Sequence, residues 1–141
     1  MRQTEKLQYS KNLDGWNNFK KKLDNRGEIP MFKERDIWWT AIGHNIGVEE
    51  NGKGDEFKRP VLIIKKFNSL MFWGVPMTTV EKSGQYYYKL EHVNDKGVRR
   101  TSYLMLSHLR TYDSRRLMQK YGMVDENSFK KIKAKVCDLL S

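Results

Sequence analysis

The 141-residue chain has little cysteine, little proline and a shortage of acidic residues. Its one cysteine, Cys137, lies at an apolar position of an expected helix. A single cysteine forms neither an internal disulfide nor the thiolate cluster of a structural zinc site. We therefore expect a fold without such cross-links, and cytoplasmic localisation as the default.

Long apolar segments are also missing. No apolar run approaches the length needed to span a membrane, and the N-terminal residues MRQTEKLQYSK lack the apolar core of a signal peptide. We expect no membrane partner. The length fits one domain that buries its own core, with a short extension.

Basic residues outnumber acidic ones by 27 to 17, which gives a net charge of +10. Such a balance indicates an acidic partner, and nucleic acid, an anionic membrane surface and an acidic protein segment are the candidates. The chain also has four Trp, seven Tyr and six Phe. These aromatic residues suit both a small β-rich core and the stacking of bases.

Residues 1–30 are expected to form a basic helical extension, set apart from a main domain at 31–141. Apolar residues recur there at helical spacing, at Leu13, Trp16, Phe19 and Leu23. Lys20, Lys21 and Lys22 lie between them. One apolar stripe favours a helix that packs on the main domain or on a subunit partner, rather than one that contacts nucleic acid.

The rest of the chain reads as short strands joined by tight turns, followed by one helix. Runs rich in β-formers predict strands at 36–42, 60–66, 70–79, 86–92 and 101–106. With no helix between them, they favour an antiparallel barrel or sandwich. Residues 125–140 form an amphipathic pattern that Asp125 or Asn127 can cap, with Phe129, Ile132, Val136 and Leu139 on the buried side.

Arg59 lies at the junction between a glycine-containing loop and a strand. Pro60 restricts the residue before it to extended geometry, so the loop ends there and the strand begins. A guanidinium held at a strand end, facing a loop with Gly47, Gly52 and Gly54, suits the binding of phosphate oxygens. An ordinary surface arginine is the equally plausible alternative.

Several chemistries are excluded by their missing residues. The segment from Gly47 to Lys53 partly matches a nucleotide-binding phosphate loop, but Gly54 replaces the hydroxyl residue that holds magnesium. The three histidines, His44, His92 and His108, have no ligand partners at metal-binding spacing. The GxSxG elbow of serine hydrolases is also missing. Arginine, threonine and carboxylates remain, and they suit RNA cleavage by the RNA's own 2′-hydroxyl group.

Five blocks of the chain closely resemble the MazF/PemK toxins of bacterial toxin-antitoxin pairs. The blocks occur in the order found in that family and cover about residues 35–140. They are Asp36–Trp39, Asn45–Glu49, Lys58–Ile64, Val75–Thr79, and Leu109–Asp113 followed by Arg116 and Leu117. Their joint occurrence is far more specific than any one block.

This resemblance implies a mainly β fold, an SH3-like antiparallel β-barrel of the CcdB/PemK type with a C-terminal helix and, here, an added N-terminal helix. It implies a homodimeric endoribonuclease that needs no metal or other cofactor and cuts single-stranded mRNA at specific sequences. The products would carry 2′,3′-cyclic phosphate and 5′-hydroxyl ends. A cognate antitoxin with an acidic, disordered tail would neutralise the enzyme.

The resemblance also assigns roles to four residues expected to be catalytic. Arg59 would neutralise charge on the pentavalent phosphorane, and Thr78 would hydrogen-bond a non-bridging oxygen. Arg110 and Asp113 would position groups and relay protons. The alternatives are a strand-end hydroxyl for Thr78, and for Asp113 a structural pair with Arg116.

Four further residues are expected to support RNA binding: Glu49, Lys58, Thr79 and His108. Glu49 either fixes Arg59 or is a solvated loop carboxylate. His108 stands where the family usually has glutamine, and a substitute acid or base competes with a half-buried structural role. The sequence also departs from the family at Arg35, where a glycine is usual, and at Val48, where some members carry histidine.

Two other functions fit the same pattern. One is a CcdB-like toxin that poisons DNA gyrase and cleaves nothing, and the other is an RNA-binding barrel without catalytic activity. Arg59, Thr78 and the 110–113 segment favour the nuclease, because a pure binding protein has no reason to assemble them. A weaker hypothesis is that the N-terminal helix gates the RNA groove or competes with the antitoxin.

Overall fold

The computed structural model describes residues 12–46, 51–54 and 56–141. Two α-helices and seven strands are present there. In chain order they are α2 (Leu13–Asp24), β1 (Asp36–Ala41), β2 (Lys58–Lys66), β3 (Met71–Thr78), β4 (Tyr87–Val93), β5 (Arg99–Met105), β6 (Arg110–Asp113), β7 (Leu117–Met123) and α3 (Glu126–Asp138). The 3-10 turns η1 (Leu106–His108) and η2 (Ser114–Arg116) flank β6.

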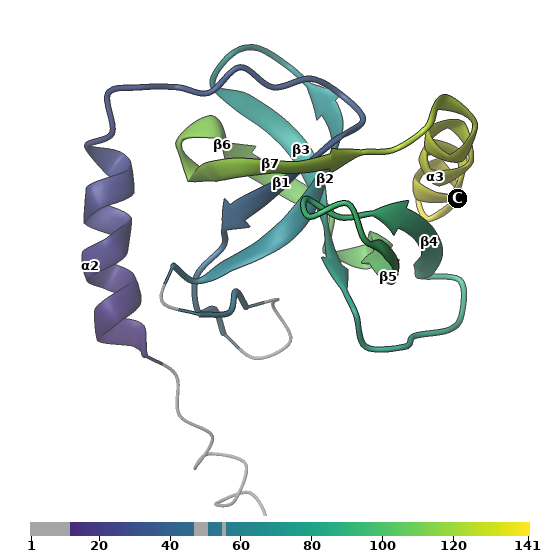
Figure 1. Ribbon diagram of the computed structural model, residues 1–141, viewed down its shortest axis with the longest axis horizontal. Coiled ribbons are helices and arrows are strands. Elements are labelled where there is room, and N and C mark those ends of the chain that lie inside the picture. The colour runs from purple at the N-terminus through teal and green to yellow at the C-terminus, as the bar shows by residue number, and fades with distance from the viewer. Residues whose placement is uncertain (1–11, 47–50, 55) are drawn as a thin grey trace, which may run out of the picture.

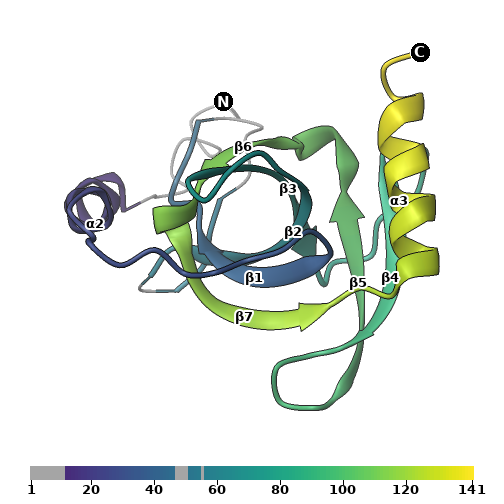
Figure 2. The ribbon, with the colours of Figure 1, turned by 90° about the horizontal axis from the view of Figure 1, so that it is seen from above.

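The strands form one curled antiparallel sheet in the order β4-β5-β3-β2-β1-β7. Strand β3 pairs along one edge with β2; on its other edge its first half pairs with β6 and its last two residues with β5. With this change of partner the sheet curls, and Figure 2 shows β1, β2, β3, β6 and β7 around a ring, with β4, β5 and α3 to one side of it. Helix α2 stands on the opposite side (Figure 1).

Strand β2 is buried on both faces, which explains its continuous apolar run. Val61 and Ile63 belong to the apolar cluster inside the ring. Leu62 and Ile64 belong to a second cluster, which α3 covers with Phe129 and Ile132. A strand between two cores cannot alternate polar and apolar residues.

The five predicted strands are confirmed, with their ends shifted by at most two residues. Strands β6 and β7 were not predicted. Residues 110–113 had been assigned to a motif, and β7 carries exposed polar residues and Gly122, which weaken a strand pattern. The prediction for Cys137 was wrong, because its side chain is exposed.

Helix α3 begins at the predicted cap. The Asp125 carboxylate accepts a hydrogen bond from the Ser128 backbone N–H at 2.9 Å. This bond, which favours the charged carboxylate, lowers the pKa of Asp125. Phe129 and Ile132 are buried and Val136 is partly buried, as the sequence pattern predicted.

The backbone conformation of Arg35 shows why glycine suits this position, where the sequence departs from the family pattern. Its φ is 79°, a left-handed conformation that glycine adopts without steric cost. Two hydrogen bonds to Val124 hold it there: the Val124 N–H donates to the Arg35 carbonyl at 3.0 Å, and Arg35 Nε donates to the Val124 carbonyl at 2.9 Å. The side chain thus offsets part of the strain that its backbone carries.

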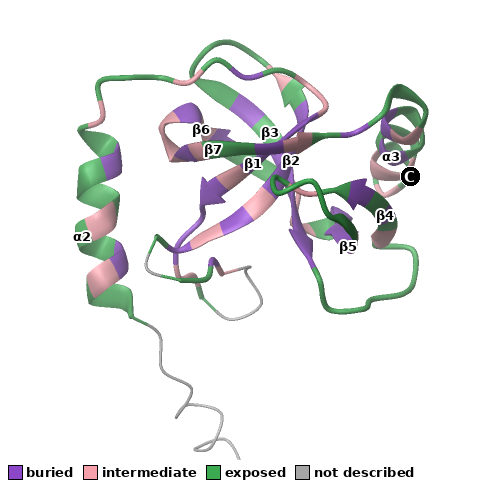
Figure 3. Cartoon of the chain, in the orientation of Figure 1, coloured by how far each residue is buried: buried purple, intermediate pink, exposed green. Residues whose placement is uncertain are grey.

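Helix α2 packs on the main domain. Packing there or on a subunit partner was the role that its apolar stripe favoured. Trp16 and Leu23 are buried against Ala41 and Phe57, and the buried positions of α2 are visible in Figure 3. Leu13, predicted to share this stripe, is 52% exposed. Within the described residues, no helix is long and apolar enough to cross a membrane.

Candidate functional site

A cleft of about 680 Å³ opens where the ends of β2 and β3 meet the turn between β4 and β5. We call it the basic cleft. Its described lining residues are Trp39, Lys53, Gly54, Lys58, Arg59, Pro60, Met77, Thr78, Thr79, Asn94, Asp95, Lys96, Arg100, Ser102, Gln119 and Tyr121. They come from five strands and three connecting segments, so only the folded chain assembles the cleft.

Arg59 lies at the inner wall of the cleft and is only 8% exposed. Its Nε donates to the Asn51 carbonyl at 2.9 Å, and its Nη1 donates to the Met77 carbonyl at 3.2 Å. Pro60 follows it inside β2, opposite Trp39 of β1. The guanidinium is therefore fixed by backbone carbonyls on two different segments, which is how a charge is held ready for a ligand.

Thr78 and Thr79 close β3 in the same cleft. Val61 pairs directly with Pro76, so the antiparallel register continues to Arg59 opposite Thr78. The Thr78 hydroxyl is buried and accepts a hydrogen bond from the Val80 N–H at 3.2 Å, whereas Thr79 is exposed. The structure thus brings Arg59 and Thr78 together at one hollow.

The cleft carries strong positive charge. Five of its described lining residues are cations, namely Lys53, Lys58, Arg59, Lys96 and Arg100. Asp95 is the one carboxylate among the described lining residues, and its Oδ2 accepts from Trp39 Nε1 at 3.0 Å and Gln119 Nε2 at 3.3 Å. Such a surface attracts anions.

An aromatic wall faces these cations. The Lys58 ammonium lies 5.1 Å from the Trp39 ring centre, and Trp39 meets Tyr121 edge to face at 5.4 Å. Burial, with Asp95 nearby, raises the pKa of Tyr121, so it stays a neutral phenol. Trp39 lines the cleft, while Trp38 and Tyr112 lie in the core.

A histidine–serine pair backs the cleft. His92 Nε2 and the Ser102 hydroxyl are 2.8 Å apart, and Ser102 belongs to the lining. Burial lowers the pKa of His92, which favours its neutral form. Sequence reasoning set His92 aside because it lacks nearby metal ligands.

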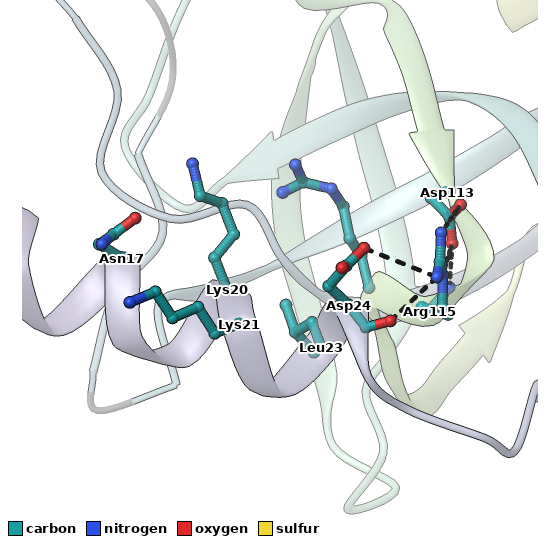
Figure 4. Close-up of a pocket in the computed structure, with 8 residues that line it drawn as sticks. Asn17, Lys20, Lys21, Leu23, Asp24, Asp113 and Arg115 are labelled. Atoms are coloured by element: carbon teal, nitrogen blue, oxygen red, sulfur yellow. Dashed lines mark hydrogen bonds and ion pairs between the residues drawn. The ribbon is translucent and has the colours of Figure 1, made fainter.

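Asp113 lies elsewhere, in a second hollow of about 370 Å³ between α2 and η2. We call it the seam. It is lined by Asn17, Lys20, Lys21, Leu23, Asp24, Asp113, Arg115 and Arg116. Figure 4 shows Arg115 reaching Asp113 on one side and Asp24 on the other. The seam thus joins the N-terminal helix to the barrel.

The Asp113 carboxylate is occupied by Arg115. Two side-chain hydrogen bonds of 2.9 Å join the groups, and the Arg115 N–H adds a third at 2.8 Å. These contacts lower the pKa of Asp113. The sequence alternative of a structural pair named Arg116, but Arg115 is the residue that forms it.

The remaining predicted residues are dispersed. Arg110 is exposed, with its guanidinium carbon 4.7 Å from the Tyr112 ring centre, and it does not line the cleft. His108 is half-buried at the end of η1 and also lies outside the cleft lining. Lys58 lines the cleft and forms an ion pair with Glu56 at 3.2 Å. Glu49 falls outside the described residues.

Sequence reasoning missed several cleft residues: Lys53, Asp95, Lys96, Arg100 and Gln119. The net charge was a signal only for the three cations among them. These residues come from several segments and none belongs to the five family blocks. Among the described residues, no group of three His, Cys, Asp or Glu side chains is placed to bind a metal ion.

Comparison with known proteins gives the class of this chain. Residues 33–140 match the PemK-like, MazF-like toxins of type II toxin-antitoxin systems. The match spans most of the chain, so the protein belongs to this toxin family. No curated protein sequence matches the chain significantly.

Solved structures agree on the fold. The chain is similar to MazF from Deinococcus radiodurans (TM-score 0.61, 18% identity, covering 81% of this chain and 98% of that one). It is also similar to an endoribonuclease from a mycobacterial species in complex with its cognate antitoxin (TM-score 0.60, 14% identity, 78% and 95% covered). These matches confirm the predicted barrel type, and at such identities they show the fold alone.

Proposed function

We propose that this protein is a sequence-specific endoribonuclease toxin that cleaves single-stranded mRNA without a metal ion. The observation that carries the proposal is the meeting of Arg59 and Thr78 in one basic cleft, in a chain of this toxin family. A phosphodiester bound there would meet a fixed guanidinium and a hydroxyl, while the surrounding lysines attract the RNA backbone.

The reaction is an internal transfer. The ribose 2′-oxygen attacks the adjacent phosphorus, the bond from phosphorus to the 5′-oxygen breaks, and a 2′,3′-cyclic phosphate forms. The 2′-hydroxyl loses a proton and the leaving 5′-oxygen gains one. Negative charge grows on the non-bridging oxygens of the phosphorane, where Arg59 and Thr78 would act.

Proton transfer is less well supported. The resemblance assigned it to Arg110 and Asp113, but in the structure neither lines the cleft, and Asp113 is bound to Arg115. The proposal therefore rests on charge stabilisation by Arg59 and Thr78. The catalytic roles of Arg110 and Asp113 stay predictions.

The proposed partners follow from the same surface. An antitoxin with an acidic, disordered tail would be attracted by the five cations of the cleft, and one structural relative is seen with its cognate antitoxin. Binding there would exclude RNA by competition. Homodimer formation and cytoplasmic localisation stay predictions.

The test uses the purified full-length protein and a long transcript in EDTA. We expect discrete fragments whose 5′ ends accept phosphate from a kinase without prior dephosphorylation and whose 3′ ends are cyclic phosphates. A matched transcript with one 2′-deoxynucleotide at a mapped cut site should resist cleavage at that site alone.

Three results would contradict the proposal. RNA that stays intact would favour a non-nuclease toxin, and salt-dependent retention without cleavage would favour an RNA-binding barrel. Cleavage at the 2′-deoxy position would mean that another nucleophile attacks. Mapping the cut sites in the same experiment would also give the recognised sequence.

A further inference from the structure

Besides the seam, α2 meets the barrel at the segment that leads from β1 to Arg59. Residues 1–32 lie outside the part of the chain that matches the toxin family, so the family match gives α2 no role. Helix α2 nevertheless packs against residues that neighbour the basic cleft. Its contacts there suggest what it does.

Trp16 of α2 lies against Gly43, which follows the end of β1 by two residues. A Cβ atom at Gly43 would lie 2.0 Å from Trp16 Cε2, so only glycine allows the indole ring this close. Gly43 also has a φ of 79°, which favours glycine for a second reason. Next to it, His44 Nδ1 accepts a hydrogen bond from the Asn12 N–H at 2.9 Å.

Phe57, two residues before Arg59, is held in an unusual conformation. Its φ is 54°, in the left-handed region that bulky residues rarely adopt. Its ring packs against the rings of Trp16, Phe19 and His44, with centroids 5.5, 5.9 and 5.0 Å away. Strained backbone persists only where surrounding contacts fix it, and two of these three rings belong to α2.

A chain of backbone hydrogen bonds connects this packing to the guanidinium. The Gly43 N–H donates to the Phe57 carbonyl at 3.0 Å, and the Gly52 N–H donates to the Gly43 carbonyl at 2.6 Å. Asn51, the neighbour of Gly52, supplies the carbonyl that accepts from Arg59 Nε at 2.9 Å. The bonds thus connect the two residues that contact Trp16, Gly43 and Phe57, to the carbonyl that holds Arg59.

We propose that α2 positions Arg59, with Trp16 as the positioning residue that holds Gly43 and Phe57 and, through them, the Asn51 carbonyl. This inference rests on the proposed function, since it assigns Arg59 to RNA cleavage. Trp16 is not among the described residues that line the cleft. Without its ring, Phe57 loses a contact that holds its left-handed backbone, and the Asn51 carbonyl loses its fixed position. The Met77 carbonyl still holds Arg59 by Nη1, so the loss is partial.

The activity test compares full-length variants on one RNA. We expect Trp16→Ala to lower kcat about tenfold while KM changes by less than about twofold, because a small displacement of a transition-state group mainly slows the chemical step. Trp16→Phe should recover most of the loss. Leu13→Ala, at an exposed position of the same helix, is the control and should leave kcat and KM unchanged.

Gly43→Ala is the second variant, because its methyl group collides with the Trp16 ring while α2 itself is unaltered. It should lower kcat as Trp16→Ala does, and it decides the question if Trp16→Ala fails to fold. Wild-type kcat in either folded variant would overturn the proposal. So would an equal loss in Leu13→Ala, which would mean a general effect of helix substitutions.

Amide hydrogen exchange gives a readout that does not depend on activity. In Trp16→Ala, the amides of Gly43, Gly52 and Phe57 should exchange faster, while those of β4 and β5 keep their wild-type rates. Unchanged exchange at the first three amides would overturn the proposal even if activity fell. If the wild-type protein leaves RNA intact, the proposed function fails, and this measurement still tests the connection between α2 and the Arg59 segment.

Discussion

The basic cleft and the seam are both hollows lined by lysine and arginine, but their charges are arranged differently. In the seam, four cations face Asp24 and Asp113, and Arg115 contacts both carboxylates. In the cleft, the described lining residues include five cations and one carboxylate, Asp95, which accepts hydrogen bonds from the indole of Trp39 and the amide of Gln119. Lys58 also forms an ion pair with Glu56. Among the described lining residues, the seam thus has two carboxylates for four cations and the cleft has one for five.

This difference separates a structural use of charge from a binding use. The seam's arginines hold a helix: Arg115 Nη1 donates to the Asp24 carbonyl at 3.0 Å, and Arg26 Nη1 donates to the Arg115 carbonyl at 2.9 Å. The cleft's cations line one open hollow, and such a surface suits an anionic ligand such as RNA. A cluster of basic residues therefore indicates a phosphate site only where the protein does not already neutralise it.

The largest expected effect compares one arginine from each region. Arg59→Ala should lower RNA cleavage at least about a hundredfold, because it removes a donor that acts on the phosphorane. Arg115→Ala removes the same side chain from the seam and should change cleavage by less than about fivefold, because its contacts are structural. Cleavage rates and circular dichroism spectra of both variants are the measurements.

The outcome decides whether the two regions differ in kind. Near-normal cleavage by a folded Arg59→Ala protein would remove Arg59 from the reaction. An equal loss in a folded Arg115→Ala protein would place the seam in the RNA site. A cleavage loss in Arg59→Ala that is matched by a loss of secondary structure would be a folding effect only.

The cleft's central pair was predictable because its signals are local. Pro60 places Arg59 at a strand end, and the pattern around Pro76 places Thr78 at the end of the next strand. Two consecutive antiparallel strands with a short turn bring such ends together. The fold class followed in the same way, from turn residues between runs of β-formers.

The seam could not be predicted because its contacts join distant parts of the chain. Arg110 and Asp113 belong to one sequence block, which suggested one site. Strand β6 instead pairs with the first half of β3, so Asp113 lies opposite Met71, seven residues from Thr78 along that strand. Arg115 bridges the Asp113 carboxylate and Asp24 of α2. No local sequence pattern predicts where α2 packs.

Asp113→Asn is the next test, with a smaller expected effect. It weakens the bidentate contact with Arg115, so we expect a destabilisation of about 1 kcal/mol, visible as a melting temperature lower by a few degrees. Cleavage should fall much less than in Arg59→Ala. A loss of cleavage as large as that of Arg59→Ala, at an unchanged melting temperature, would support the catalytic role that the resemblance assigned to Asp113.

The smallest expected effect uses pH to separate the two regions. Burial lowers the pKa of His92 behind the cleft, although the nearby Glu91 charge opposes this shift. The unfolded chain, with a histidine pKa of about 6.5, then binds the proton more readily than the folded chain. The contribution of His92 to the free energy of unfolding is therefore fully present above about pH 6.5, and it is lost as the pH falls below that value. The lowered pKa of Asp113 keeps the seam's contribution intact until the pH falls below about 3.9.

Thermal unfolding at pH 7.5 and pH 5.5 measures the His92 contribution. Tyr121 and Ser102 contact His92, and the Glu91 charge lies nearby. Between these two pH values we expect the wild type to lose more unfolding free energy than His92→Gln does. The difference should be less than about 1 kcal/mol. All other titratable side chains are the same in the two proteins, so the difference between them reports His92 alone. An identical loss in both proteins would mean that His92 binds its proton equally well in the folded and unfolded chains. In that case, sensitivity to acid in this pH range would not distinguish the cleft from the seam.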